Sequence, residues 1–251
     1  MHKLSKGPIP KELRDFCRAN PTCRDWNSFY SNYHDSYKVL KKQIFTEQNF
    51  LCAYCEEQLA ETENTKQRIE HFHPKEDKSS ERNWAFDWSN MIGVCTGGSQ
   101  ERPTVLHCDA KKEQNVAYDL CEGFLLNPLD MPAACLFSIN RATGELQANT
   151  RKCQTVFLCH NKFQTVAELV ENTIKVLNLN CDKLNKKRLV VIREFERLRK
   201  SLRQNSSTTS SVRSKIAERW FSSSPPSFFT TRRILLGEYA EQILSQQGYN
   251  N

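Results

Sequence analysis

Apolar residues recur at helical spacing in the first fifty residues. Pro10 stands where it opens a helix that runs through Leu13 and Phe16 and breaks at Pro21, because proline is well tolerated in the first turn of a helix. Between residues 37 and 50 a second apolar stripe, less regular than the first, predicts another helix. This helix runs directly into a pair of cysteines.

The second half of the chain has two more regular helical stripes. They comprise Phe163, Val166, Val170, Thr173 and Leu177, then Leu184, Arg188, Val191, Phe195, Leu198 and Leu202. We expect these two helices to pack together as a helical hairpin. The second also carries a basic face of Arg193, Arg197, Lys200 and Arg203. Such a face is more often solvated than in contact with phosphate, and both interpretations stay open.

Strands are predicted between these helical regions. Residues 136–139 and 145–146 are short apolar runs on either side of a turn at 142–144, a pattern typical of paired strands. By contrast, residues 68–127 hold short apolar runs rich in His, Trp and Cys, with few helical periods. We interpret that stretch as the chemical centre of the protein.

Composition predicts where the chain divides. Residues 205–211, NSSTTSS, have the composition of a flexible linker. The predicted division is therefore 1–125 with a core at about 48–122, then 126–204, then a linker and helical tail at 205–251. Residues 222–226 form a second break, and the tail after it is expected to be a small appendage whose terminal amphipathic helix docks on the body or on a partner.

Charge and cysteine content narrow the class of protein. The 251 residues are 38% hydrophobic, enough for a buried core, and the net charge of +7 suits a polyanionic partner. No run of about 18 apolar residues could span a bilayer, and no signal peptide is recognisable. A cytoplasmic location is expected, and in a reducing compartment closely spaced members of the 11 cysteines are candidate metal ligands.

Four cysteines have a spacing suited to zinc. Cys52 and Cys55 form a CxxC pair whose thiolates can reach one tetrahedral ion, and Cys95 and Cys108 complete a set of four. His107 is an alternative fourth ligand, because imidazole binds zinc equally well. A redox-active CxxC is the rival interpretation, but no thioredoxin-like βαβ pattern surrounds it.

Within the loop that these cysteines would close lies the segment RIEHFHPK at 68–75, in which Glu70 and His71 are adjacent. The flanking apolar residues indicate a strand, on which neighbouring side chains point to opposite faces. A carboxylate suits Mg²⁺ or Mn²⁺, and a neutral imidazole can take a proton from water at pH 7. Asp109 follows the last cysteine directly.

The order of these motifs resembles that of HNH endonucleases. The matching segments are CAYC, IEHFHPK, DWSNM, GVC and HCDAKK, and the late LNLNCDKLNKKR makes the chain similar to the HNH nucleases of Septu-type and retron-associated anti-phage systems. The resemblance covers roughly residues 37–200. It implies an α+β fold, in which a ββα-metal core stapled by a structural Zn²⁺ is embedded in a mostly helical chain.

The resemblance also implies catalytic roles. Glu70 and Asp109 would hold a catalytic Mg²⁺ or Mn²⁺, and His71 would be the general base. Each also has a bland alternative, since Asp109 could simply cap a helix.

Three further residues receive supporting roles. By the same resemblance, Asn90 would hold the loop that orients His71, and Lys112 would contact phosphate. His73 flanks the site and is a candidate substrate contact or third metal ligand. The bland interpretation of Asn90 is a turn residue.

The expected function is thus hydrolysis of phosphodiester bonds in DNA, or in RNA such as tRNA, as the effector of an anti-phage defence system. The resemblance implies an ABC- or SMC-like ATPase partner and, in some systems, a retron reverse transcriptase with its RNA-linked DNA. The alternative is a catalytically silent, zinc-stabilised nucleic-acid-binding or adaptor subunit. That subunit would bind without metal-dependent cleavage.

Overall fold

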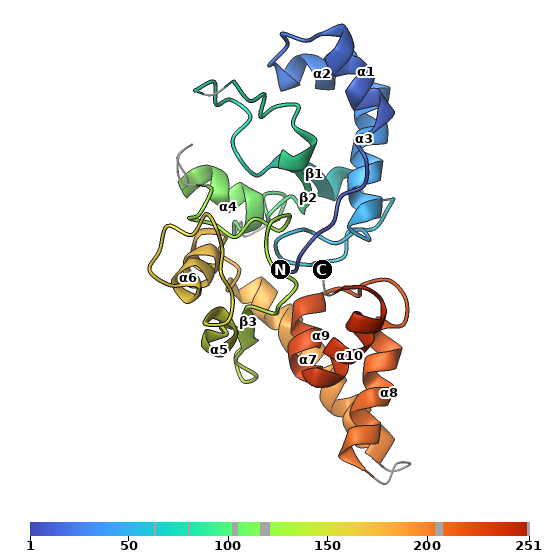
Figure 1. The fold of residues 1–251 in the computed structure, drawn as a ribbon. Coiled ribbons are helices and arrows are strands. Elements are labelled where there is room, and N and C mark those ends of the chain that lie inside the picture. The colour runs from blue at the N-terminus through green and yellow to red at the C-terminus, as the bar shows by residue number, and fades with distance from the viewer. Residues whose placement is uncertain (63, 80, 102–104, 116–120, 204–207, 250–251) are drawn as a thin grey trace.

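The computed structural model describes residues 1–62, 64–79, 81–101, 105–115, 121–203 and 208–249. It is mostly helical, with two small sheets (Figure 1). The helices are α1 (Lys11–Ala19), α2 (Trp26–Asn32), α3 (His34–Glu47), α4 (Cys108–Asn115), α5 (Thr150–Cys153), α6 (Val166–Val176), α7 (Asp182–Arg203), α8 (Thr209–Phe221), α9 (Phe229–Leu236) and α10 (Glu238–Gln246). The strands are β1 (Gln67–His71), β2 (Met91–Cys95), β3 (Phe137–Ile139) and β4 (Leu146–Ala148).

The N-terminal helices confirm the two predicted stripes. Helix α1 begins directly after Pro10 and buries Leu13 and Phe16, and α3 buries Leu40 and Ile44. Helix α2 was not predicted, because its 7 residues are too few to show a period. Its start is nonetheless encoded locally, since the Asp25 side chain accepts a hydrogen bond from the first turn.

The central sheet pairs β1 with β2 in antiparallel register, so that Glu70 lies opposite Ile92. Helix α3 packs on this sheet, and α4 packs against β2. The side-chain amide of Gln48, just after α3, donates to and accepts from the backbone of Gly93 on β2. Only glycine fits at residue 93, because a Cβ added there would lie 2.9 Å from the Phe45 ring. Two strands are thus followed in sequence by a helix on the same small core.

The strand pair predicted at residues 136–139 and 145–146 is confirmed as β3 and β4. Its turn is formed by the Asn140 side chain, which accepts from the backbone of Ala142, and by Gly144 with a positive φ of 77°. Glycine is favoured in such a conformation because it lacks a Cβ.

The predicted hairpin of α6 and α7 is wrong in its choice of partner. Helix α6 packs mainly against β4, α4 and α5, whereas α7 packs along α8 and α9. Both apolar stripes are therefore buried as expected, each against an element distant in sequence. Periodicity identifies a face that must be covered, but not the element that covers it.

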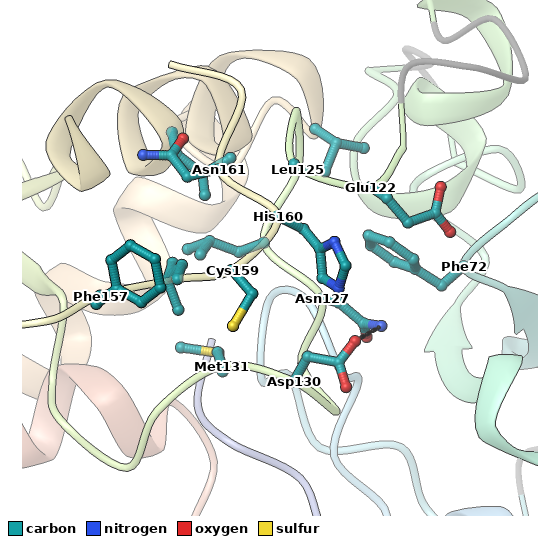
Figure 2. A pocket seen from close by; sticks show the side chains of 14 residues that line it. Phe72, Glu122, Leu125, Asn127, Asp130, Met131, Phe157, Cys159, His160 and Asn161 are labelled. Atoms are coloured by element: carbon teal, nitrogen blue, oxygen red, sulfur yellow. Dashed lines mark hydrogen bonds between the residues drawn. The ribbon is translucent and has the colours of Figure 1, made fainter. Parts of the chain in front are cut away.

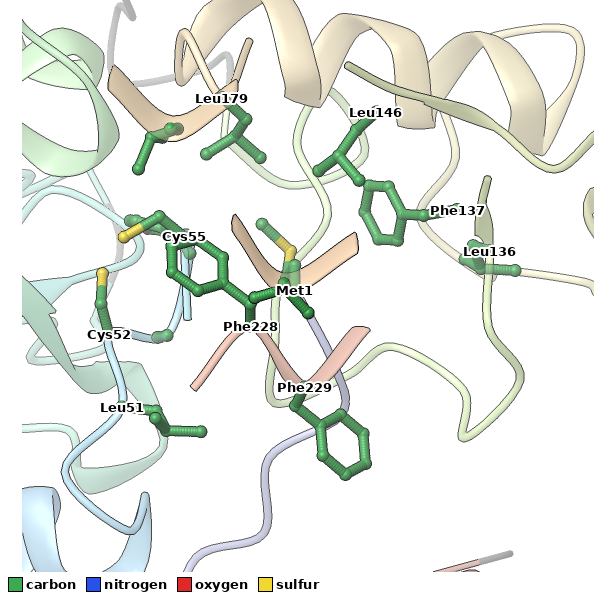
Figure 3. Close-up of a cluster of buried hydrophobic side chains, with 14 of the residues drawn as sticks. Met1, Leu51, Cys52, Cys55, Leu136, Phe137, Leu146, Leu179, Phe228 and Phe229 are labelled. Atoms are coloured by element: carbon green, nitrogen blue, oxygen red, sulfur yellow. The ribbon is translucent and has the colours of Figure 1, made fainter. Parts of the chain in front are cut away.

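The C-terminal tail belongs to the core and is not a small appendage. Helix α8 begins at Thr209, inside the predicted linker, whose residues 205–207 lie outside the described residues. The tail's Phe228 and Phe229 lie beside Met1 and near Leu51 (Figure 3). One buried cluster draws on the beginning, middle and end of the chain, and the division at 125 and 204 stays a prediction. Along the described part of the chain, no helix combines the length and apolar character needed to span a membrane.

Candidate active site and metal centre

Four buried cysteines converge from three different elements. Cys52 and Cys55 follow α3, Cys95 ends β2, and Cys108 begins α4. The Sγ atoms of Cys52 and Cys108 lie 3.9 Å apart, as do those of Cys55 and Cys95, and all four sulfurs lie within 4.8 Å of one another. Zinc bonded to sulfur at about 2.3 Å gives tetrahedral edges of about 3.8 Å. The cluster therefore has the dimensions of a zinc site.

The cysteines do not share one protonation behaviour. Hydrogen bonding from the Cys108 thiol holds the pKa of Cys95 well below its usual value, whereas burial raises the pKa of Cys108. Binding of a dication favours the thiolate form of every ligand. Four converging cysteine sulfurs are a common donor set of structural zinc sites.

A glycine turn closes the twelve-residue gap between the last two cysteines. Gly97 has a positive φ of 57°, and a Cβ there would lie 2.1 Å from the carbonyl oxygen of His107. The Gly97 carbonyl instead accepts a hydrogen bond of 3.0 Å from the His107 backbone. This close backbone approach brings Cys95 and Cys108 together although they are distant in sequence.

His107 lies beside the cluster. Its Nδ1 is 3.2 Å from the Cys108 sulfur and 4.0 Å from the Cys95 sulfur. Because four sulfurs already converge, the geometry favours the all-cysteine set over a set in which His107 replaces one of them. An imidazole in this position can donate a hydrogen bond to a ligating thiolate.

Glu70 and His71 point to opposite faces of β1, as the strand pattern predicts. Glu70 faces α4, where its Oε1 lies 2.5 Å from the Lys112 ammonium and 3.5 Å from the Tyr54 hydroxyl. Lys112, expected at phosphate, is buried at 5% exposure and also donates to the Phe72 carbonyl at 2.6 Å. The Lys112 ammonium thus binds Glu70 and the backbone at the end of β1.

Asp109 is brought next to Glu70 by its place in the first turn of α4. Burial and the neighbouring Glu70 carboxylate raise the pKa of Asp109 to about 10. Burial alone would raise the pKa of Glu70 too, but the charge of Lys112 outweighs it and lowers that pKa. The Asp109 Oδ1 is buried without a described hydrogen-bond partner. Two converging carboxyl groups with an orphaned oxygen form a donor set that fits Mg²⁺ or Mn²⁺.

His71 is held as a neutral imidazole. Its Nε2 lies 3.0 Å from the Ala85 carbonyl oxygen, which can only accept, so Nε2 carries the proton and Nδ1 keeps a lone pair. The ring packs edge-on against Trp26, with centroids 4.6 Å apart. Burial lowers the pKa of His71 to about 4, so the free base predominates at pH 7.

Asn90 ties together the backbone that follows β1. Its Oδ1 accepts from the His73 backbone at 2.7 Å, and its Nδ2 donates to the carbonyls of His73 and Trp84 at 2.8 and 2.9 Å. The His73 ring stacks on Trp84 and its two nitrogens lie 2.9 Å from Glu122 and 2.7 Å from Asp77. Both side chains flank the site without lining the hollow described next.

One hollow of about 240 Å³ brings Glu70, His71, Asp109 and Lys112 together. Arg68, which sequence reasoning missed, lines it as well. It is partly exposed on the same face of β1 as Glu70, and no carboxylate is bonded to it among the described residues. The period of two along a strand was the signal that could have identified it.

A larger cavity of about 300 Å³ is lined in part by Phe72 and Glu122 (Figure 2). Leu125, Met131 and the 86% exposed Phe157 contribute to its lining. It contains neither the Glu70 and Asp109 pair nor His71. The smaller hollow is therefore the candidate active site, on the basis of its chemistry and not of its size.

Comparison with known proteins identifies two relatives. No protein-family model matches the chain. The chain is 31% identical to an Escherichia coli protein named "Retron Ec83 putative HNH endonuclease" in an alignment of 251 positions that covers 94% of each chain. It is 26% identical to a protein of Vibrio cholerae serotype O1 biovar El Tor named "Retron Vc95 putative HNH endonuclease", over 47% of this chain and 55% of that one. The first similarity extends over almost the whole length of both proteins.

Proposed function

This chain belongs to the family of retron-associated HNH endonucleases, and we propose that it hydrolyses phosphodiester bonds with a divalent metal ion. One observation carries the proposal. A neutral imidazole and a buried pair of carboxyl groups, one with an orphaned oxygen, line the same hollow. A base and a cation site side by side are the two requirements of metal-assisted hydrolysis.

His71 acts as the general base in this proposal. The hydrogen bond from Nε2 to Ala85 holds the ring, so its Nδ1 accepts a proton from water that attacks the phosphorus. The phosphorus–oxygen bond to the leaving 3′ oxygen breaks, and that oxygen takes up a proton, which yields a 5′ phosphate and a 3′ hydroxyl. Asn90 positions the backbone at His73, two residues after the general base.

Glu70 and Asp109 would hold the Mg²⁺ or Mn²⁺. When bound there, this ion supplies Lewis-acid stabilisation of the charge that develops on the scissile phosphate. Lys112 holds Glu70 in place from α4 through its 2.5 Å contact. Arg68 would contact the phosphate, because its guanidinium has no carboxylate partner among the described residues, whereas the Lys112 ammonium is paired with Glu70.

The second metal role is structural. Cys52, Cys55, Cys95 and Cys108 would hold zinc and thereby fix the start of α4, which carries Asp109, against the end of β2. The two sites are thus coupled through adjacent residues, 108 and 109. Structural zinc contributes directly to folding free energy in small modules.

The biological setting is proposed from the relatives. Their names associate those proteins with retrons, and we extend this association to the present chain as an effector of anti-phage defence of the Septu or retron kind. An ABC- or SMC-like ATPase and a reverse transcriptase with RNA-linked DNA are the partners that this role implies. The substrate is DNA or RNA, because hydrolysis by metal and water needs no 2′ hydroxyl.

Incubation with Mg²⁺ or Mn²⁺ and duplex DNA, single-stranded DNA or tRNA tests the proposal. We expect His71→Ala to lower the cleavage rate about 10² to 10⁴-fold in protein that circular dichroism shows to be still folded at the assay temperature. His160→Ala is the matched control, since His160 is exposed and lies outside the hollow. Cleavage by His71→Ala at the full rate would refute the assignment, and binding without cleavage by the wild type would favour the silent adaptor.

A further inference from the structure

A row of basic side chains runs along the solvent-exposed face of α7. Lys186, Val190, Arg193, Arg197 and Lys200 alternate at spacings of four and three residues, so they lie on one face of the helix. All five are exposed, and Val190, the one apolar member, is 61% exposed. We call the four cationic residues of this row, Lys186, Arg193, Arg197 and Lys200, the α7 basic stripe.

The acidic residues of α7 do not neutralise the stripe. Glu194 accepts from Arg232 at 3.0 Å and from the Trp220 indole at 3.3 Å. Glu196 pairs with Arg199 at 2.6 Å. Both carboxylates are thus engaged at the flanks of the stripe. Among the described residues, no carboxylate lies within ion-pair distance of any of its four cationic residues.

Other basic residues of α7 form ion pairs. Lys183 and Lys187, in the first two turns, pair with Glu101 and Glu57. Basic residues at spacings of three and four along a helix repel one another and destabilise it. The stripe retains that repulsion over most of the helix, and a polyanion would relieve it.

We propose that the α7 basic stripe binds the sugar–phosphate backbone of a nucleic acid. At a rise of about 1.5 Å per residue, the stripe extends over about 21 Å. Duplex DNA carries about 12 phosphate charges over that length. Arginine supplies a planar fork of donors that matches phosphate. A protein partner is less well suited, because interfaces are usually anchored by aromatic or apolar side chains and this face offers only Val190.

The stripe is separate from the candidate active site. None of its residues lines the hollow around His71. Helix α7 lies with α8, α9 and α10, at the end of the molecule opposite α1 and α2 (Figure 1). Phosphate contacts fix position and carry no sequence information. The stripe would therefore add affinity at a second point and leave selectivity to the hollow.

Salt-dependent binding tests the stripe independently of cleavage. In a His71→Ala background, the affinity for labelled duplex DNA, single-stranded DNA and tRNA is measured by fluorescence anisotropy over a range of salt. The stripe variant is Arg193→Gln, Arg197→Gln, Lys200→Gln. The control, Lys38→Gln, Lys42→Gln, Lys152→Gln, removes the same charge from exposed sites elsewhere. The three polymers distinguish duplex from single-stranded ligands.

For duplex DNA we expect the slope of log affinity against log salt to become shallower by about 2 to 3 in the stripe variant, since each lost phosphate contact contributes about 0.9. The control should keep the wild-type slope. A variant with lysine at residues 193, 197 and 200 should retain most of the wild-type affinity. Melting temperatures equal to that of the wild type would exclude unfolding as the cause of weaker binding.

Equal weakening of binding in the stripe and control variants, or no weakening in either, overturns the proposal. So does a stripe variant that keeps nucleic-acid affinity but loses a co-purifying protein. A chain that binds but never cleaves would disprove the proposed function and leave the stripe standing.

Discussion

At the scale of single residues, the candidate site depends on environments that the residue types alone do not specify. His71 and Glu70 are adjacent in sequence, yet one faces Trp26 and the Ala85 carbonyl and the other faces α4. Burial keeps the first neutral, while Lys112 keeps the second ionised. The alternation of a strand thus separates a proton acceptor from a cation ligand within two residues.

Arg68 offers a test of the hollow at this scale. We expect Arg68→Met to lower kcat/KM by about 10 to 100-fold, the loss that follows from removing a charge-assisted hydrogen bond of about 1.5–3 kcal/mol. The kcat/KM of Arg68→Lys should lie between those of the wild type and Arg68→Met, because lysine keeps the charge but loses the bidentate fork. The measurement is steady-state cleavage, with the exposed α1 residue Arg14→Met as control. An unchanged kcat/KM in Arg68→Met would exclude a phosphate contact.

Lys6 provides a prediction of pH dependence. Its ammonium lies against the Trp88 ring and donates to the Trp88 carbonyl at 2.6 Å, and burial lowers its pKa from 10.5 to about 7. The unfolded chain therefore binds the proton more tightly, so stability rises with pH between about 7 and 10.5 and is lost again as the pH falls.

Thermal melting across that range tests this sign. The stability of the wild type relative to Lys6→Met should increase from pH 7 to pH 10. Lys38→Met, at a position 63% exposed, should show no such trend. A difference between wild type and Lys6→Met that stays constant with pH would contradict the assigned shift.

At the scale of elements, short connections decide whether the metal ligands meet. Helix α4 begins at Cys108 and β2 ends at Cys95. The turn at Gly97 lets the backbone of this connection approach that of His107. The same connection sets Asp109 opposite Glu70. A change that disrupts this connection is therefore expected to disturb both the cysteine cluster and the arrangement of Glu70 and Asp109 in the hollow.

Gly97→Ala should lose the metal. A Cβ at Gly97 would lie 2.1 Å from the His107 carbonyl, whereas Gly237 has the same φ of 57° and nothing within 4 Å of an added Cβ. The two alanine variants therefore share a positive φ but differ in the clash. We expect Gly97→Ala to retain less than half of the zinc measured per chain after dialysis, and Gly237→Ala to retain it all. Equal zinc content in both variants would show that the turn does not govern the site.

At the scale of the whole molecule, the tail closes the core. Phe228 donates its backbone N–H to the carbonyl of Glu56, next to Cys55, and Thr230 donates to the Glu56 carboxylate at 2.9 Å. The end of the chain thus braces the segment that carries the first cysteine pair. Removal of residues 205–251 would expose apolar surface as well as remove a docking surface, so deletion cannot separate those roles.

A single substitution tests the structural role of the tail alone. Phe229 is 1% exposed within the main cluster, and Phe229→Ala should destabilise the protein by about 3–5 kcal/mol. Phe157→Ala, at a position 86% exposed, should have little effect. Chemical denaturation measures both. Equal stability of the two variants would show that the tail is not integral to the core.

The sequence by itself determined the local features of this protein. Pro10 predicted the start of α1, the apolar alternation predicted β1, and the Cys, Glu and His motifs predicted which chemistry to look for. These features depend on neighbours within a few residues, and a single sequence carries that information directly.

Only the tertiary structure decided which elements meet. It packed α7 against α8 instead of α6 and buried Lys112 on Glu70. It also left Arg68 in the hollow without a carboxylate partner among the described residues and favoured the four sulfurs over His107. Each outcome depends on contacts between residues tens of positions apart. The sequence shows that an apolar face must be buried or that a charge requires a partner, but many distant segments could provide the contact. The choice among them is made by the packing of the whole chain.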